Sequence, residues 1–543
     1  MKHKYIVVAG SLMSGLGKGI VTSSILKLLK LYGIKSLPIK FDGYLNYDCG
    51  TMNPYRHGEV FVLDDKGEVD MDFGNYERFM NKSMSSKLSI TGGKLFDGII
   101  KKERRGDYLG RDVQIIPHMT DFIKEWVTGI ADSEKLDVLV IEVGGTVGDI
   151  ENSYFIEAMR QLSLSEDVLF INLTYVPELE SVGEQKTKPT QIALRGLMQL
   201  GIQPKFIFCR SSRPLTKSAK EKIALFSNLT TNRIIDDNEI GTIYELPLKL
   251  ISQGFDKDLI KELGFEGKAI NRDELKSWKD FVNALKDGFK NTANIAIVGK
   301  YVELRDSYAS VKEALLHGAY ANRAKVNIEW IESEGLEGLA PAECATRLSR
   351  FDGILVPGGF GKRGIEGMIN AIRFARENKK PYLGLCLGMQ LMAIEYARNV
   401  SMLKGANSSE FDSNAKYKVI DLMEDQRSIK QKGGTMRLGL WPADIKPGTM
   451  AFEAYRSKRI NERHRHRYEF NNAYKRTLER SGLVVSGMSP DNRIVEIVEW
   501  KSHFGIGTQA HPELKSRPEA PAPLFTAFIK SAIAAKKAGT AAT

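Results

Sequence analysis

The sequence predicts an α/β protein built from two doubly wound domains, each with a sheet that is covered by helices. Short apolar, β-branched runs alternate with helical patterns through the first half, and a second such series begins near residue 295. The chain has 543 residues, which is too many for one hydrophobic core and favours two domains.

The elements of the first half are predicted from periodicity and from glycine stop signals. Strands are expected at 5–9, 138–143, 168–176 and 206–209, and helices at about 20–32 and 192–200. Buried strands that alternate with helices are typical of a parallel sheet.

The second half repeats this pattern after a polar, charged stretch at about 255–294. Strands are expected at 295–298, 326–331, 354–357, 382–385, 494–498 and 504–508. We therefore predict a first domain at 1–265, a linker helix at 266–293, a second domain at 294–530 and a disordered tail at 531–543, where Ala and Lys dominate.

Composition and charge limit the classes of partner. The chain is 42% hydrophobic and 27% charged with a net charge of +11, as in a globular protein that binds acidic partners such as nucleoside triphosphates. The basic residues are spread along the chain, so nucleic acid is not expected as a partner, and no apolar run is long enough to cross a membrane. Four dispersed cysteines predict neither disulfides nor a zinc site, which favours a cytoplasmic location.

A glycine-rich loop at 10–19 joins the first predicted strand to the first predicted helix. Backbone N–H groups and a helix N-terminus in such a loop can bind phosphate oxygens, and Lys18 can reach the terminal phosphates. The loop ends Gly-Lys-Gly where the usual P-loop ends Gly-Lys-Ser/Thr, so a plain strand–helix turn stays an alternative.

Carboxylates near this loop are candidates for magnesium, which prefers oxygen ligands. Asp70 and Asp72 form one pair, Glu142 ends a predicted buried strand, and Asp149 and Glu151 follow it. Each of these carboxylates has a surface or capping role as its alternative. Glu142 stands out, because four apolar residues precede it and two glycines follow it.

Cys386 lies in GLCLG (384–388), between a predicted strand and a predicted helix. Glycines two residues to either side allow a sharp turn that exposes the sulfur at a helix N-terminus, as in a nucleophile elbow. His511 and Glu513 follow the last predicted strand, and residues two apart on extended chain share a face. Glu513 is therefore expected to orient His511 as the base for Cys386.

Two further stretches belong to this half of the chain. The sequence GGFG (358–361) follows a strand and is expected to supply backbone N–H groups as an oxyanion hole. The run RHRHRYE (463–469) is the densest basic segment. It is read as a solvated strand face, as an RNA contact, or as a site for a carboxylate or nucleotide phosphate; the last suits a glutamine site best.

The chain resembles the CTP synthase family from about residue 4 to about residue 530. The matching stretches are SGLGKG (14–19), HGEVFV (57–62), NYERF (75–79), KERRGDYLG (102–110), EQKTKPTQ (184–191), GGTMRLG (433–439) and RHRHRYE (463–469). The resemblance implies a P-loop, dethiobiotin-synthetase-like synthase domain joined to a class I glutamine amidotransferase domain.

The resemblance also implies roles for individual residues. The implied catalytic residues are Cys386, His511, Glu513, Lys18 and Lys40. The implied ATP contacts are Gly15, Leu16, Gly17, Lys18, Gly19, Ile20, Asp72, Asn238, Glu239 and Ile240, and the implied magnesium ligands are Asp72 and Glu142. The implied UTP or CTP contacts are Ser14, Asp149, Ile150, Glu151, Lys186, Thr187, Lys188, Pro189, Thr190, Gln191 and Lys222. The implied glutamine contacts are Gly359, Leu387, Gly388, Met389, Gln390, Glu410 and Arg467.

The activity implied by the resemblance is amination of UTP to CTP, with ATP, Mg²⁺ and ammonia from glutamine. Activation by GTP, inhibition by CTP, a homotetramer and filaments are implied in the same way, and free ammonia requires a protected passage between the two sites. Alternatives are another amidotransferase-ligase, such as a cobyric acid synthase-like enzyme, an inactive nucleotide-sensing scaffold, and a nucleic-acid-binding protein.

Overall fold

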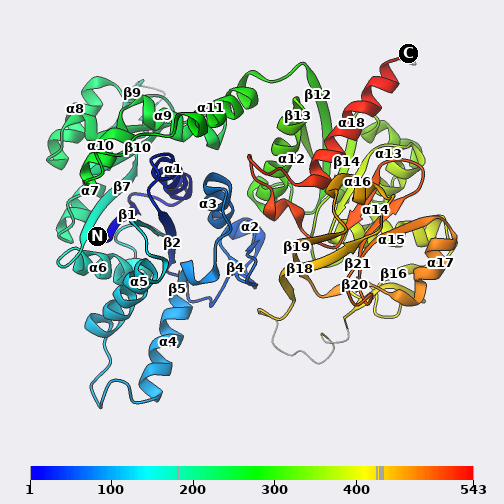
Figure 1. Ribbon diagram of the computed structural model, residues 1–543, viewed down its shortest axis with the longest axis horizontal. Helices are drawn as coiled ribbons and strands as arrows, with labels where there is room; N and C mark the ends of the chain where they lie inside the picture. Colours follow the sequence, from blue (N-terminus) through cyan, green and yellow to red (C-terminus); the bar gives the residue numbers. More distant parts are fainter. Residues whose placement is uncertain (1, 180–182, 424–425, 427–432, 542–543) are drawn as a thin grey trace. The chain divides into compact units, whose positions relative to one another are not determined.

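The computed structural model describes residues 2–179, 183–423, 426 and 433–541, in two compact units (Figure 1). The first unit is Met1–Asp48 with Asn75–Lys286, and the second is Cys49–Gly74 with Asp287–Thr543. Each unit has a single large sheet and its own hydrophobic core.

The sheet of the first unit has seven parallel strands in the order β11-β10-β7-β1-β6-β2-β5. The strands are β1 (Lys4–Gly10), β2 (Ser36–Asp42), β5 (Ser89–Thr91), β6 (Val138–Val143), β7 (Asp167–Tyr175), β10 (Phe206–Ser211) and β11 (Ile234–Asn238). β1, β2 and β6 are buried on both faces, apart from half-buried Lys4 at the start of β1, which explains why they read as continuous apolar runs.

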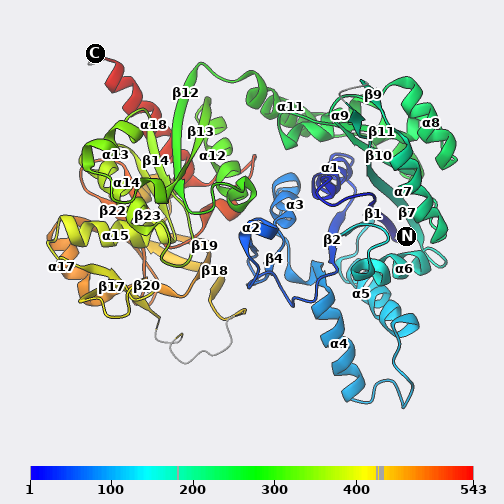
Figure 2. The ribbon, with the colours of Figure 1, turned by 180° about the vertical axis from the view of Figure 1, so that it is seen from behind.

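Helices cover both faces of this sheet (Figure 2). They are α1 (Lys18–Leu31), α4 (Gly92–Arg104), α5 (Thr120–Glu134), α6 (Ser153–Leu162), α7 (Lys188–Gln199), α8 (Lys217–Ser227), α9 (Leu246–Ser252), α10 (Phe255–Glu262) and α11 (Arg272–Asp287). α1 packs with α9, while α5 packs with α6 and α7 with α8. The chain runs from β1 through β2 to β5, and then back across the sheet in the opposite direction through β6, β7, β10 and β11. Right-handed crossovers therefore place α1 on one face and α5, α6, α7 and α8 on the other.

The second unit has a nine-stranded sheet in the order β13-β12-β14-β15-β23-β22-β21-β18-β19. Its strands are β12 (Asn291–Gly299), β13 (Ala324–Glu332), β14 (Gly353–Val356), β15 (Tyr382–Leu385), β18 (Arg437–Ile445), β19 (Arg459–His466), β21 (Leu483–Met488), β22 (Val495–Trp500) and β23 (Gly505–Thr508). The strands from β13 to β23 in this order are parallel, and β22, β21, β18 and β19 continue the sheet in antiparallel fashion.

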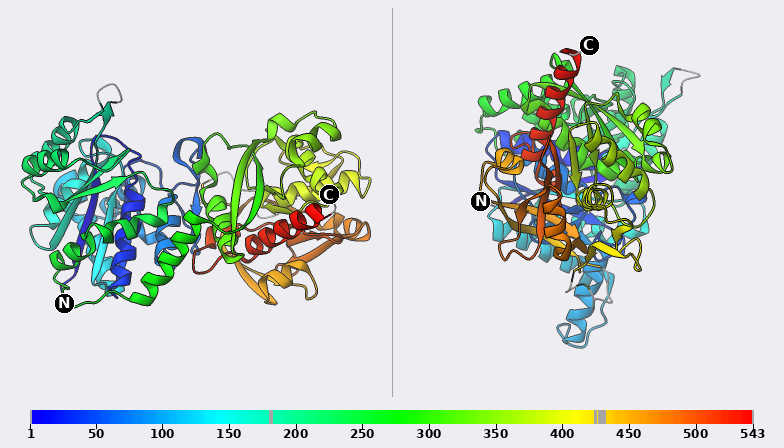
Figure 3. Two further views of the ribbon diagram at one scale, coloured as in Figure 1. Left: turned by 90° about the horizontal axis from the view of Figure 1, so that it is seen from above. Right: turned by 90° about the vertical axis from the view of Figure 1, so that its right-hand side faces the viewer.

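Two hydrophobic clusters, one on each face, hold helices on the second sheet (Figure 3). The helices are α12 (Ala309–Ala321), α13 (Pro341–Leu348), α14 (Ile365–Glu377), α15 (Leu387–Asn399), α16 (Met450–Tyr455), α17 (Lys475–Arg480) and α18 (Pro523–Ala541). α12 and α16 pack with α18, whereas α13 and α15 pack with α14. The predicted class, two α/β units with parallel strands at their centres, is confirmed.

The segment expected to be a linker helix packs into the first unit instead. In α11, Trp278 is buried and donates from Nε1 to the carbonyl of Tyr244 at 3.0 Å. Fully buried Lys27 of α1 lies 4.3 Å above the Trp278 ring and forms an ion pair with Glu274 at 2.9 Å. The aromatic side chains at helical spacing in α11 therefore belong to a face that packs on the first unit, so α11 is not an exposed linker.

The tail expected to be disordered from residue 531 is helical in the structure as far as Ala541, and the last two residues lie outside the described range. Ala532 is fully buried, and Ile533 packs against the same cluster. An alanine-rich sequence is a strong helix former, and here it continues a helix whose earlier turns are already anchored by Phe525 and Phe528.

A third difference concerns residues 49–74, which the sequence assigns to the first domain. The structure groups this segment, which contains α2 (Pro54–His57), β3 (Phe61–Val62) and β4 (Glu68–Val69), with the second unit.

In the part of the chain that the structure describes, no helix is both long and apolar enough to cross a bilayer.

Candidate active site

Cys386 occupies a strained turn between β15 and α15. Its backbone lies at φ 49° and ψ −98°, a region that non-glycine residues rarely adopt. A Cβ on Gly388 would come within 2.2 Å of the carbonyl of Val356, and one on Gly384 within 2.7 Å of the backbone of Gly388. The two flanking glycines are therefore required by close packing of the elbow, and the sulfur lies at the N-terminus of α15.

His511 and Glu513 reach the same site from the chain that follows β23. His511 Nδ1 lies 2.8 Å from Glu513 Oε1, and Nε2 on the other side of the ring makes no hydrogen bond with the described residues. The segment is not extended as expected: Pro512–Lys515 forms a 3-10 turn, and the turn brings the carboxylate back toward the ring. Gly358 lies against this pair, since a Cβ there would sit 2.8 Å from His511 Cε1 and 3.7 Å from Cys386 Cβ.

The electrostatics of this pair favour a charged imidazole. Burial alone would lower the pKa of His511, but the negative charges of Glu513 and Cys386 raise it to about 10. An imidazolium beside Cys386 stabilises the thiolate, which is the nucleophilic form of cysteine.

We expect kcat/KM for glutamine hydrolysis to decrease as the pH rises through about 10. In Glu513→Gln, this decrease should occur at lower pH. Without the carboxylate charge the pKa of His511 is lower, so the imidazolium loses its proton earlier. The pKa is raised above the ordinary 6.5, so protonated His511 also stabilises the fold. That contribution is complete below pH 6.5 and is lost as the pH rises to about 10. An alkaline limb that does not move in Glu513→Gln would contradict this account.

The glycine loop 358–361 is held in place by a buried lysine and a carboxylate. Lys300 donates from Nζ to the carbonyls of Phe360, at 3.0 Å, and Gly361, and burial lowers the pKa of Lys300 to about 8. Glu410 accepts the Gly361 N–H at 2.7 Å, and burial raises the pKa of Glu410. The loop is therefore fixed beside Leu387, whose N–H belongs to the first turn of α15 and is available to an oxyanion.

The basic run on β19 binds carboxylates of the chain itself. Arg463 is fully buried and pairs with Asp64 at 2.6 Å, and Arg465 pairs with Glu68 at 2.8 Å. Both carboxylates belong to the 49–74 segment, which these arginines attach to the second unit. The carbonyl of Arg465 also lies 3.9 Å from the sulfur of Cys386, so the same strand forms one wall of the site.

The alternate side chains of the run point into the protein. His464 and His466 are buried with their rings in contact, Nδ1 of the first lying 3.2 Å from Nε2 of the second, and burial holds the pKa of each well below 6.5. Arg467 donates to Gln426 at 2.7 Å and to Thr435 at 2.9 Å. Of the three alternatives for this run, the solvated strand face does not apply to these histidines or to Arg463, which are buried.

A cavity of about 80 Å³ opens beside the sulfur within the second unit. Cys386 and His511 line one part of it, and Pro54, Glu59 and Val60 of the 49–74 segment line another. Sequence reasoning missed this contribution, because nothing local to 49–74 indicates what it packs against.

In the first unit, the predicted phosphate loop joins β1 to α1. Gly17 caps α1 in the left-handed region at φ 92°, so the first N–H groups of the helix face the loop. Lys18 is buried and donates from Nζ to the carbonyl of Gly145 at 2.7 Å, and Val147 N–H donates to Gly10 at 2.8 Å. These contacts place the loop that contains the predicted Asp149 and Glu151 next to the glycine loop.

Lys40 and Glu142 lie side by side on neighbouring parallel strands. They are register partners on β2 and β6 and form a buried ion pair at 2.8 Å, and Tyr76 donates to the other oxygen of Glu142.

Asp72 begins α3 (Asp72–Met80) and falls in the second unit, so the predicted Asp72–Glu142 metal pair stays a prediction. Among the described residues, no group of three or more His, Cys, Asp and Glu side chains is arranged for a metal ion.

The remaining predicted nucleotide contacts are found at several places in the first unit. Ser14, Asp149, Ile150, Glu151 and Lys222 are exposed. Lys186 and Thr187 precede α7, whose first turn contains Lys188, Pro189, Thr190 and Gln191, with Thr190 and Gln191 buried. Asn238 ends β11 at the sheet edge, followed by Glu239 and Ile240, three strands away from β1. Apart from exposed Lys222 on α8, these positions cluster after strand ends or at a helix N-terminus, where open α/β sheets bind ligands.

Two family models match the chain: one described as CTP synthase N-terminus over residues 4–265, and one described as glutamine amidotransferase class-I over 303–531. The chain is 50% identical to the CTP synthase of Caldanaerobacter subterraneus subsp. tengcongensis, over 97% of this chain and 98% of the relative. Identity is 51% with that of Pyrococcus abyssi, over 97% and 98%, and 47% with that of Methanocaldococcus jannaschii, over 98% and 99%. The chain belongs to the CTP synthase family.

A solved structure is also similar to part of this CTP synthase family member. The glutaminase domain of Trypanosoma brucei CTPS with bound acivicin is 38% identical, covers 44% of this chain and 93% of that chain, and superposes with a TM-score of 0.42. The two family models represent both halves of the CTP synthase organisation inferred from the sequence, so the rival amidotransferase-ligase interpretation is set aside.

Several residues of the site escaped the sequence analysis. Tyr76 and Lys300 gave no local signal, since a buried tyrosine and a lysine after a strand are common. Gln509 did carry a usable signal: it lies two residues before His511, directly after a strand, where alternate side chains share a face.

Proposed function

We propose that the protein makes CTP from UTP, using ATP and the ammonia released when its second unit hydrolyses glutamine. Near-full-length identity of about half with several CTP synthases supports the substrates. The single structural observation that carries the proposal is the arrangement of Cys386 at a strained elbow beside the His511–Glu513 pair.

In the glutamine half-reaction, the thiolate of Cys386 attacks the side-chain amide carbon of glutamine and forms a C–S bond. The carbonyl oxygen becomes an oxyanion, which the N–H groups of Gly359 and Leu387 can bind. His511 gives its proton to the amide nitrogen as the C–N bond breaks, and ammonia leaves. Water, deprotonated by His511, then cleaves the thioester to glutamate and restores the thiolate.

Ammonia has to reach the UTP site without entering bulk water, where it would be protonated. The cavity beside Cys386 supports a protected start to this path, since its wall includes Pro54 and Val60, which come from a segment matched by the synthase family model. We infer that the 49–74 segment forms the first part of the passage.

In the synthase half-reaction, O4 of the uracil ring takes the γ-phosphoryl group of ATP, and ADP leaves. Ammonia then attacks C4 and displaces phosphate, which gives CTP. We assign Lys18, Lys40 and the loop 14–20 to the phosphates of ATP. The residues at 149–151 and 186–191, with Lys222, are assigned to UTP or CTP, and those at 238–240 to adenine.

Magnesium fits the predicted ligands by the chemistry of the donor set, since Asp72 and Glu142 offer carboxylate oxygens only. When bound with ATP, Mg²⁺ supplies positive charge that stabilises the transferred phosphoryl group. Lys40, whose ammonium already contacts Glu142, keeps that carboxylate oriented along the sheet.

Glutamine is assigned to Gly359, Leu387, Gly388, Met389, Gln390, Glu410 and Arg467. Leu387 to Gln390 form the first turn of α15, Glu410 contacts the 358–361 loop, and Arg467 directly follows β19. The proposal also includes activation by GTP, inhibition by CTP, a cytoplasmic location, and a homotetramer that assembles into filaments, with neither nucleic acid nor membrane as partner. Self-association is supported by large apolar side chains on and after α4 that face solvent, with Ile100 57%, Leu109 87% and Ile116 52% exposed.

The test is CTP formation by the purified chain with UTP, ATP, Mg²⁺ and GTP, with either glutamine or ammonium chloride as the nitrogen source. Product is expected with both sources, and none when UTP, ATP or Mg²⁺ is omitted. If neither source yields CTP while glutamine is still hydrolysed, the amidotransferase assignment survives and UTP is the wrong acceptor.

A further inference from the structure

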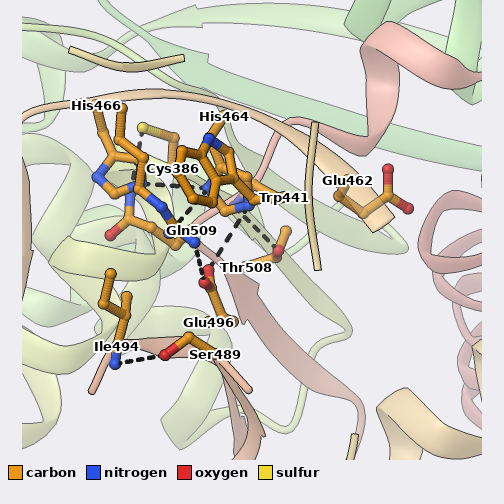
Figure 4. A network of polar contacts seen from close by, with 12 residues as sticks. Cys386, Trp441, Glu462, His464, His466, Ser489, Ile494, Glu496, Thr508 and Gln509 are labelled. Atoms are coloured by element: carbon orange, nitrogen blue, oxygen red, sulfur yellow. Dashed lines mark hydrogen bonds and ion pairs between the residues drawn. The ribbon is translucent and has the colours of Figure 1, made fainter. Parts of the chain in front are cut away.

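Gln509 is completely buried and directs its side chain at the catalytic sulfur. Its Nε2 lies 3.5 Å from Cys386 Sγ, within the range of an N–H···S hydrogen bond. Figure 4 shows the two residues together with His464, His466 and Glu496. The triad already described, Cys386 with His511 and Glu513, makes no use of this amide.

The orientation of the Gln509 amide follows from its neighbours. Gln390 lies 2.9 Å from the backbone carbonyl of Tyr468, which can only accept, so the facing atom of Gln390 is the donor Nε2. The same Nε2 is 3.3 Å from Gln509, so the atom that faces it is the acceptor Oε1. The other atom of the Gln509 amide, the one facing the sulfur, is therefore the N–H donor.

The backbone of Gln509 is fixed as firmly as its side chain. Its N–H donates to the carbonyl of Glu496 at 2.8 Å, and it continues directly from β23. The amide therefore has one position relative to the elbow.

The sulfur thus lies between one donor and one acceptor besides His511. The carbonyl of Arg465, at 3.9 Å, can accept only from a protonated thiol, whereas the Gln509 N–H can donate to a thiolate. A hydrogen bond to the charged form of a group favours that form and fixes its position.

We propose that Gln509 is a positioning residue, whose amide N–H holds the Cys386 sulfur as a thiolate facing His511. The inference rests on the proposed glutamine hydrolysis at Cys386 and adds a residue to that machinery. Gln509 acts through the sulfur and not on the substrate, so its loss should lower kcat and leave KM for glutamine near its original value.

Two substitutions separate this role from simple packing. Gln509→Glu keeps the size, the shape and the acceptor for Gln390, but it replaces the donor by a carboxylate oxygen. Gln509→Met removes both polar atoms and fills similar space. A packing role predicts that glutamate is tolerated better, whereas the donor role predicts that it is worse, because its charge repels the thiolate.

We expect kcat for glutamine hydrolysis to fall on the order of tenfold to a hundredfold in Gln509→Met and further in Gln509→Glu. CTP formation from ammonium chloride should stay within about twofold of wild type in both. Thr508→Val is the matched control, since it removes a buried hydroxyl from the adjacent position. Within the described residues, this hydroxyl accepts one hydrogen bond, from Ala510 N–H at 3.2 Å. It should leave both rates unchanged.

Alkylation of Cys386 by iodoacetamide, measured against pH and corrected with Cys386→Ala as the blank for the other cysteines, provides a readout that needs no turnover. The pH of half-maximal rate should rise in Gln509→Met and rise further in Gln509→Glu. The proposal is overturned by the reverse order of the two variants, by a raised KM with unchanged kcat, or by a parallel loss of ammonia-dependent synthesis. If wild type hydrolyses no glutamine, the proposed function fails, and the alkylation order still decides the role of Gln509.

Discussion

Replacing Cys386 by alanine is expected to abolish CTP formation from glutamine and to preserve CTP formation from ammonium chloride. The substitution removes the nucleophile, and losses of about 10⁴-fold or more are usual when a covalent catalyst loses its reacting atom. The ammonia reaction does not use the sulfur, so its rate should stay near that of wild type. Comparing both nitrogen sources on one preparation gives the measurement its own internal control.

Cys344→Ala is the matched control for this experiment. Cys344 is also buried in the second unit, and burial raises the pKa of its thiol, so it is expected to be inert and its replacement silent. If Cys386→Ala still produced CTP from glutamine, or lost the ammonia-dependent reaction as well, the division of labour between the two units would be wrong.

Replacing Lys18 by methionine is expected to reduce CTP formation from both nitrogen sources by about a thousandfold or more. In the proposed mechanism the ammonium of Lys18 neutralises charge on the phosphates of ATP, and removing such a group costs roughly 10²–10³-fold or more in rate. Glutamine hydrolysis measured without nucleotides should continue, because the triad lies in the other unit. This outcome is the reverse of that expected for Cys386→Ala, which loses glutamine hydrolysis and keeps CTP formation from ammonium chloride.

Lys30→Met serves as the control, because Lys30 lies on the same helix with its side chain 28% exposed and forms an ion pair with Glu274 at 3.0 Å. Lys18→Met also removes the hydrogen bond to Gly145, which contributes about 1 kcal/mol to stability, so the unfolding transition should be recorded for each variant. Full synthase activity in Lys18→Met would remove this lysine from the ATP site.

The parts of the fold that could be predicted are those encoded by local pattern. Strands at the centre of a parallel sheet are apolar on both faces, so β1, β6 and β15 were found within a residue or so of their ends. The elbow was found for a similar reason, because two glycines must flank the nucleophile wherever its strand and helix pack tightly.

The parts that could not be predicted depend on partners far away in the sequence. The arginines of β19 look like a solvated basic stripe until Asp64 and Glu68 are placed opposite them, about 400 residues earlier in the chain. Trp278 and Phe281 gave the right helix but not the surface on which it packs. Burial of charge is a tertiary property, and a single sequence does not show which opposite charge compensates it.

The attachment of the 49–74 segment limits how this protein can be divided. An amidotransferase fragment that starts at the boundary suggested by the sequence, near residue 294, would lack the acidic partners of Arg463 and Arg465 and one wall of the cavity at Cys386. Two positive charges that are neutralised in the intact chain would then face solvent or each other. Chimeras between relatives should therefore exchange this short insert together with the C-terminal half. The unit that recombination has to transfer is therefore discontinuous in the gene. It consists of two separate stretches of coding sequence, which have to be exchanged together.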